Sequence, residues 1–322
     1  MPASSLRVPD FFVVGHSKCG TTALYLALRS HPQVFMPSIK EPRFFAPELR
    51  SRFRGGSEDV RPDTLDGYLE LFSDARKDQI LGEASPSYLR SRDAAARIAA
   101  LAPAARMIAV FREPASFLRS FHLQSVHNHI ETETDLRRAL ALEPERRAGR
   151  SIPESSHVPA TLLYSDHVRY VEQLRRFESS FPREQLLALI YDDFRDDNLG
   201  TIRRVLRFLE VDDSLEIEAV RTDTLDSVRA PRLHRLSRAL QLARRNPQAA
   251  SRPARALNAV IPAAVKGDRA RSLWKRTVYG EPPEPDQGLM LELRRRYKPE
   301  VLALSEHLGR DLVSLWGYDD IG

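Results

Sequence analysis

The residue types most suited to chemistry lie in one short loop near the start of the chain. The loop reads Gly15-His16-Ser17-Lys18-Cys19-Gly20-Thr21-Thr22 and follows an apolar run at residues 11–14. The two glycines allow a tight turn, so that amide N–H groups of the loop and of the next helix point at an oxyanion. The loop therefore predicts a phosphate-binding site made by Ser17, Lys18, Cys19, Gly20, Thr21 and Thr22.

The lysine of this loop has an unusual position. The ATP- and GTP-binding version of the loop carries its lysine directly after the second glycine, where this chain has Thr21. No magnesium-binding aspartate is evident at the end of a neighbouring strand. Lys18 can still reach the terminal group of a nucleotide and neutralise charge on a bridging oxygen as a bond to it breaks. A P-loop kinase or other NTPase is the alternative hypothesis.

A second phosphate contact is predicted at Arg112 and Ser120. Arg112 follows the apolar run 107–111, at the end of a predicted strand, where open α/β sheets place ligand contacts. Pro114 is suited to begin the next helix. Ser120 then lies about two turns into that helix, on a face near Arg112. A guanidinium and a hydroxyl that converge in this way suit one phosphate group.

Glu83 is the candidate general base. It follows the apolar run 79–81 and precedes a turn, so we expect it near the same sheet edge as Lys18. A carboxylate at this place can accept the proton of an acceptor hydroxyl. Three histidines are rival bases, because histidine titrates near neutral pH without tuning. These are His122, His127 and His129. We favour Glu83 for its position in the sheet, and the choice between the two kinds of base stays open.

Alternating strands and helices must position these residues. Apolar runs predict strands at 11–14, 79–81, 107–111 and 185–191. Helical patterns lie at 22–30, 93–101, 168–181, 199–209 and 289–308. Continuous apolar strands between helices are typical of a parallel sheet covered on both faces. The fold class is therefore α/β.

The rest of the chain is less regular. We treat residues 1–322 as one domain, with an exposed loop at 46–65 and a helix followed by a loop at 130–160. A less regular cover region extends over about 229–287.

Composition limits the class of protein. The chain has 322 residues, of which 42% are hydrophobic, and a net charge of +5. The arginines are spread along the chain and mixed with acids, which does not favour nucleic acid as a partner. A single cysteine excludes an internal disulfide. We found no secretory signal and no apolar run long enough to span a membrane, so we expect a cytoplasmic protein.

Together these motifs resemble the sulfotransferases that use 3′-phosphoadenosine-5′-phosphosulfate (PAPS), above all their bacterial and heparan-type branch. The resemblance adds Lys40-Glu41-Pro42-Arg43-Phe44-Phe45 and Gly82-Glu83-Ala84-Ser85-Pro86-Ser87-Tyr88 to the segments above. It implies a P-loop-like parallel sheet, PAPS as co-substrate and no metal. It also implies that Arg112 and Ser120 hold the 3′-phosphate and that Glu83 is the base. Ala84 replaces a lysine of the heparan-type enzymes, which leaves an inactive PAPS-binding module as an alternative.

The expected reaction is transfer of a sulfuryl group to a hydroxyl of a carbohydrate or of a small natural-product acceptor. The resemblance places Lys40 and Glu41 close to donor and acceptor, and His122 is a further candidate contact to the acceptor. The sequence names neither the acceptor nor the oligomeric state.

Overall fold

The computed structural model describes residues 7–50, 61–156, 158–215, 227–228, 230, 233 and 277–321. The fold and the site refer to these residues. Most of the predicted cover region at about 229–287 lies outside them.

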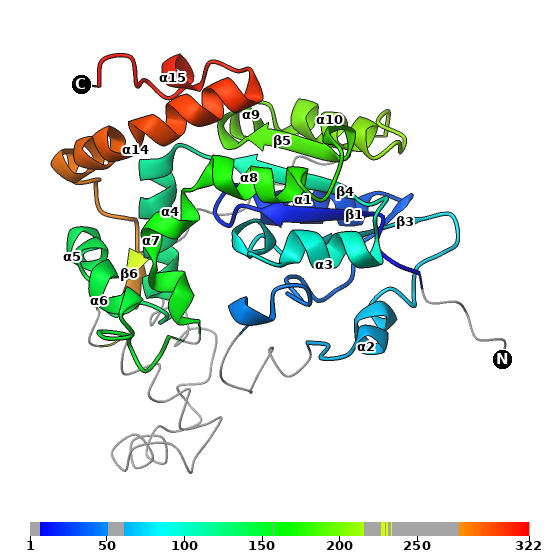
Figure 1. Ribbon diagram of the computed structural model, residues 1–322, viewed down its shortest axis with the longest axis horizontal. Coiled ribbons are helices and arrows are strands. Elements are labelled where there is room, and N and C mark those ends of the chain that lie inside the picture. Colours follow the sequence, from blue (N-terminus) through cyan, green and yellow to red (C-terminus); the bar gives the residue numbers. More distant parts are fainter. Residues whose placement is uncertain are drawn as a thin grey trace, which may run out of the picture.

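A five-stranded parallel sheet forms the centre of the molecule (Figure 1). Its strand order is β2-β3-β1-β4-β5, and each neighbouring pair runs parallel. The strands are β1 (Phe11–Gly15), β2 (Val34–Phe35), β3 (Ile80–Ala84), β4 (Arg106–Phe111) and β5 (Leu186–Ile190). Every residue of β1 is buried, as a strand with a helix layer on both faces requires. The predicted α/β class with a parallel sheet is confirmed.

Helices surround this sheet. The longer ones are α1 (Thr21–Ser30), α3 (Ala94–Leu101), α4 (Pro114–His127), α8 (Tyr170–Glu178), α10 (Asn198–Phe208) and α14 (Gln287–Leu308). α14 packs against α4 and α8 and runs along one side of the molecule (Figure 1). Pro114 begins α4, as expected, and the Glu113 carboxylate caps it by accepting from the N–H groups of Ala115 and Ser116. Within the described ranges, every helix is too short or too polar to cross a bilayer.

Shorter elements complete the described chain. The α-helices are α2 (Leu65–Glu70), α5 (Leu136–Ala141), α6 (Glu143–Arg147), α7 (Tyr164–His167), α9 (Tyr191–Asp196) and α15 (Leu312–Leu315). The 3-10 turns are η1 (Pro47–Leu49), η3 (Tyr88–Arg90), η4 (Pro159–Leu162) and η5 (Arg183–Gln185). The strands β6 (Ser227–Val228) and β7 (Tyr279–Gly280) form an antiparallel pair.

Three expectations need correction, and one strand was missed. β2 was not predicted, because two residues are too few to give a pattern. β3 continues to Ala84, so Glu83 lies inside the strand rather than after it. Residues 51–60 of the predicted exposed loop at 46–65 lie outside the described residues, and its described part is only partly exposed, because Ala46 and Leu49 are buried. The segment 130–160 contains two short helices, α5 and α6, instead of one.

Candidate active site

The phosphate loop joins β1 to α1. Gly20 ends it with a left-handed backbone (φ 79°), and a Cβ at this position would come within 2.6 Å of the Phe194 ring. Glycine is therefore required both by the backbone angle and by space. Within the described chain, the amides of residues 17–20 donate no hydrogen bond. Unpaired N–H groups beside a helix amino terminus bind oxyanions readily, so the loop fits a phosphate or sulfate group.

Lys18 supplies the positive charge of this loop. Burial and the neighbouring guanidinium of Arg112 lower the pKa of Lys18 below its ordinary value. Cys19 is fully buried, and burial raises the pKa of its thiol to about 12. Cys19 is therefore a neutral thiol at physiological pH, and it takes part in the loop through its backbone.

Arg112 lies directly beside the loop. Its Nη1 donates to the carbonyl oxygen of Lys18 at 3.1 Å, and its guanidinium stacks over the Tyr191 ring with 4.5 Å between Cζ and the ring centroid. The Tyr170 hydroxyl donates to the Arg112 carbonyl at 2.9 Å. Ser120 is half-buried on α4. The hydrogen bond from Arg112 to Lys18, which lie 94 residues apart in sequence, thus joins the two predicted phosphate contacts.

Glu83 is fully buried in β3, opposite Phe12 of β1. The hydroxyls of Tyr88 and Tyr68 donate to its Oε2 at 2.7 Å and 3.1 Å. Its Oε1 has no hydrogen-bond partner among the described residues. Burial raises the pKa of Glu83 to about 7, although hydrogen bonds from nearby hydroxyls oppose the shift. A carboxylate with such a pKa is suited to general base catalysis near neutral pH.

The segment from Lys40 to Phe45 links the loop to Glu83. Lys40 Nζ donates to Thr22 Oγ1 at 3.3 Å, and the amide of Glu41 donates to the Ala84 carbonyl at 3.0 Å. The Glu41 carboxylate pairs with Lys40 at 3.4 Å and with Arg43 at 2.7 Å. Burial acts to raise the pKa of Glu41, but these two cations hold it at about 2. Lys40 and Glu41 therefore lie between the predicted donor site and the predicted base.

Comparison with known proteins identifies the family of the chain. A family model described as the sulfotransferase family matches residues 9–214. The chain belongs to this family. The fold is also shared with a sulfotransferase from Alicyclobacillus acidocaldarius, at 27% identity and a TM-score of 0.59, over 81% of this chain and 100% of that one. The predicted fold and family are confirmed.

Several relatives of this chain are named as carbohydrate sulfotransferases. Mouse heparan sulfate glucosamine 3-O-sulfotransferase 3B1 is 30% identical over 207 residues, which cover 64% of this chain and 47% of the relative. Human carbohydrate sulfotransferase 15 is 28% identical over 254 residues, which cover 63% of this chain and 44% of the relative. The chain spans about half the length of the curated relatives that it matches.

The three histidines considered as rival bases lie on α4 or directly after it. His122 is 2% exposed, and its ring nitrogens contact the Tyr164 hydroxyl at 2.9 Å and the Thr134 carbonyl at 3.2 Å. Burial lowers the pKa of His122. Both ring nitrogens are engaged, so His122 supports the fold and offers no ring atom to an acceptor. His127 stacks on the Tyr279 ring at 4.7 Å, and the His129 amide donates to the Val126 carbonyl at 3.0 Å.

Sequence reasoning missed three aromatic residues of the site. Tyr88 lies five positions after Glu83 in the same motif, so its spacing offered a signal. Tyr191 directly follows β5, at the sheet edge where Arg112 follows β4. That shared position was a usable signal as well. Tyr68 comes from α2, and nothing in the pattern there points to Glu83.

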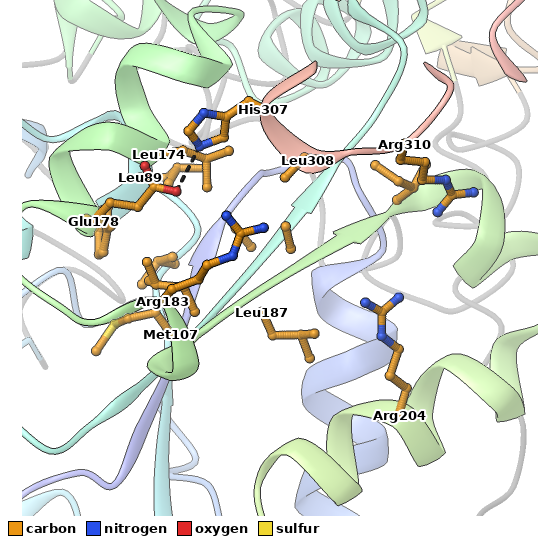
Figure 2. A pocket seen from close by; sticks show the side chains of 16 residues that line it. Leu89, Met107, Leu174, Glu178, Arg183, Leu187, Arg204, His307, Leu308 and Arg310 are labelled. Carbon is orange, nitrogen blue, oxygen red and sulfur yellow. Dashed lines mark hydrogen bonds and ion pairs between the residues drawn. The ribbon is translucent and has the colours of Figure 1, made fainter. Parts of the chain in front are cut away.

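A cavity of about 220 Å³ lies along β5 (Figure 2). Apolar side chains of β4, β5 and α8 line it, with Arg183, Arg204 and Arg310 around them. His307 Nε2 and Glu178 Oε1 lie within hydrogen-bond distance, at 2.8 Å, in its lining. None of the predicted site residues is among the lining residues. We therefore assign this cavity no part in the candidate active site.

Proposed function

We propose that this sulfotransferase transfers a sulfuryl group from PAPS to a hydroxyl group of a carbohydrate or of a small natural-product acceptor. One observation carries the proposal. A phosphate loop with an internal lysine, a braced arginine and a buried carboxylate with a pKa of about 7 are linked within one edge of a parallel sheet. Each of the three groups meets one chemical demand of sulfuryl transfer.

The donor fits the phosphate contacts. We assign the 5′-phosphosulfate to the loop from Gly15 to Thr22, because its unpaired amides favour an oxyanion. We assign the 3′-phosphate to Arg112 and Ser120. ATP has no 3′-phosphate, so a guanidinium held at this place favours PAPS over ATP. In PAPS the sulfur atom is bonded to the 5′-phosphate through a bridging oxygen. This phosphate is the leaving group when the bond between sulfur and the bridging oxygen breaks.

The residues divide the reaction between them. Glu83 accepts the proton of the acceptor hydroxyl, which allows the oxygen to bond to sulfur. The bond from sulfur to the bridging phosphate oxygen breaks, and its electron pair remains on that oxygen. Lys18 neutralises the charge that develops there. The products are the sulfated acceptor and adenosine 3′,5′-bisphosphate. The proposal of a carbohydrate acceptor draws on the activities of the relatives described above.

A thermal-shift titration tests donor choice without knowledge of the acceptor. Adenosine 3′,5′-bisphosphate should raise the melting temperature, and the increase should grow with the logarithm of its concentration above Kd. ATP with magnesium should have little effect at the same concentration. Stabilisation by ATP with magnesium and none by the bisphosphate would contradict the proposal and favour a P-loop NTPase. Labelled PAPS incubated with a panel of glycans and alcohols then tests transfer itself.

A further inference from the structure

The hydrogen bonds on Glu83 are asymmetric. Two phenol groups donate to Oε2, at 2.7 Å from Tyr88 and 3.1 Å from Tyr68, and Oε1 has no partner within the described residues. The phenols come from different parts of the fold, since Tyr88 begins η3 and Tyr68 lies on α2. Both tyrosines are fully buried. Within the described structure, one carboxylate oxygen therefore accepts both phenol hydrogen bonds and the other oxygen accepts none.

The direction of the stronger bond is fixed by the backbone. The amide of Phe45 donates to the Tyr88 hydroxyl at 3.3 Å. A phenol has one proton, and this contact occupies an acceptor lone pair, so the proton of Tyr88 lies toward Glu83. The ring of Tyr68 stacks on Phe44, with 4.5 Å between centroids and 11° between planes. Phe44 and Phe45, next to the Lys40–Arg43 cluster, therefore hold both phenols in place.

We propose that Tyr68 and Tyr88 are positioning residues, which orient Glu83 through Oε2 so that Oε1 is the oxygen that accepts the acceptor proton. This inference rests on the proposed function, and nothing in the family match assigns a role to either tyrosine. It also gives a role to Phe44 and Phe45, which follow Arg43 in the chain. These two residues hold Tyr68 and Tyr88, and the two tyrosines orient Glu83.

The surroundings of Glu83 define the expected effect of pH. The groups that act on it are the hydroxyls of Ser85, Tyr88 and Tyr68 and the charge of Glu41. Burial, followed by the charge of Glu83, raises the pKa of each tyrosine well above its usual value, so both stay protonated donors. A hydrogen bond to the charged form favours ionisation. Removal of one phenol therefore makes Glu83 harder to ionise.

The experiment compares kcat/KM against pH for the wild-type enzyme and for Tyr88→Phe and Tyr68→Phe. The acid limb should move to higher pH by about one unit for Tyr88→Phe, and by less for Tyr68→Phe with its longer bond. At pH 7 the Tyr88→Phe enzyme should be roughly five-fold slower, and it should recover at high pH. Tyr25→Phe is the matched control, because the buried Tyr25 hydroxyl donates to the Pro37 carbonyl instead.

A structural role would lower activity equally at every pH, and an acid limb that does not move in either variant overturns the inference. Binding of adenosine 3′,5′-bisphosphate shows which variants are folded, and Tyr68→Phe carries the test if Tyr88→Phe does not fold. A Glu83→Gln enzyme distinguishes failure of the proposed base from failure of the positioning role of the tyrosines. If it is inactive while the tyrosine variants keep the wild-type pH profile, the base stands and the positioning role fails. Wild-type activity in Glu83→Gln refutes the proposed base itself.

Discussion

Two buried glutamates in this protein have opposite surroundings. Glu131 is 2% exposed, and its carboxylate pairs with the buried guanidinium of Arg146 at 2.7 Å. It also accepts from the Tyr164 hydroxyl at 3.1 Å and from the amides of Thr132 and Glu133. Glu83 accepts phenol hydroxyls as well, but no cation pairs with it and one oxygen has no partner in the described structure.

The difference separates structural from chemical use of a buried charge. A buried carboxylate that is paired with a cation and with several hydrogen-bond donors destabilises the fold if one partner is removed. Here the pair of Glu131 with Arg146 holds α6 beside the segment after α4. A buried carboxylate without a cation has a raised pKa and an oxygen available for a proton, which is the property that a general base needs. Activity should therefore depend on Glu83, and folding should depend on Glu131.

The largest effect on stability is expected for Glu131→Gln. The change leaves the Arg146 charge buried without its anion, which costs about 3–5 kcal/mol. Chemical denaturation followed by circular dichroism measures this loss. The exposed Glu154 provides the control Glu154→Gln, which should change stability little. If Glu131→Gln lowered the free energy of unfolding by less than about 1 kcal/mol, the contrast between the two glutamates would be wrong.

Lys18→Met tests whether a lysine of the candidate site also affects activity more than stability. In the proposed reaction Lys18 neutralises the charge on the leaving oxygen, so its removal should lower kcat roughly 100- to 1,000-fold with little change in stability. Steady-state kinetics at saturating PAPS measures kcat. The exposed Lys77 gives the control Lys77→Met. An unchanged kcat would mean that Lys18 does not act on the leaving group.

Glu83→Gln should become more stable relative to wild type as the pH rises. The folded-state pKa of Glu83 is raised from 4.5 to about 7, so its stability contribution is complete below pH 4.5 and is lost between pH 4.5 and pH 7. The gap between variant and wild type should therefore grow by about 3 kcal/mol over that window. Denaturation curves at several pH values measure it. A gap that is the same at every pH contradicts the raised pKa.

Arg112→Ala gives the smallest and most selective effect. It should weaken binding of adenosine 3′,5′-bisphosphate by about 2 kcal/mol, roughly 30-fold. Adenosine 5′-monophosphate lacks the 3′-phosphate, so its affinity should stay nearly constant. Calorimetric titration measures both. Arg207→Ala is the control, because Arg207 forms an exposed pair with Asp213. Equal losses for both nucleotides would assign Arg112 to another part of the donor.

The sequence allowed prediction of those parts of the site that are contiguous in the chain. The phosphate loop and Arg112 with Pro114 each follow an apolar strand, Glu83 lies near the end of one, and parallel strands bring their carboxyl ends to one edge. The phenols on Glu83 depend on tertiary contacts, since Tyr68 comes from α2 and Phe45 from the segment after α1. Helical spacing also could not show that His122 turns inward to Tyr164.

The most direct test of the central claim is a single turnover of labelled PAPS with Glu83→Gln at saturating donor. The account predicts normal binding of adenosine 3′,5′-bisphosphate and transfer at least about 100-fold slower than in the wild-type enzyme. Transfer at the wild-type rate by a variant that lacks the carboxylate would contradict it.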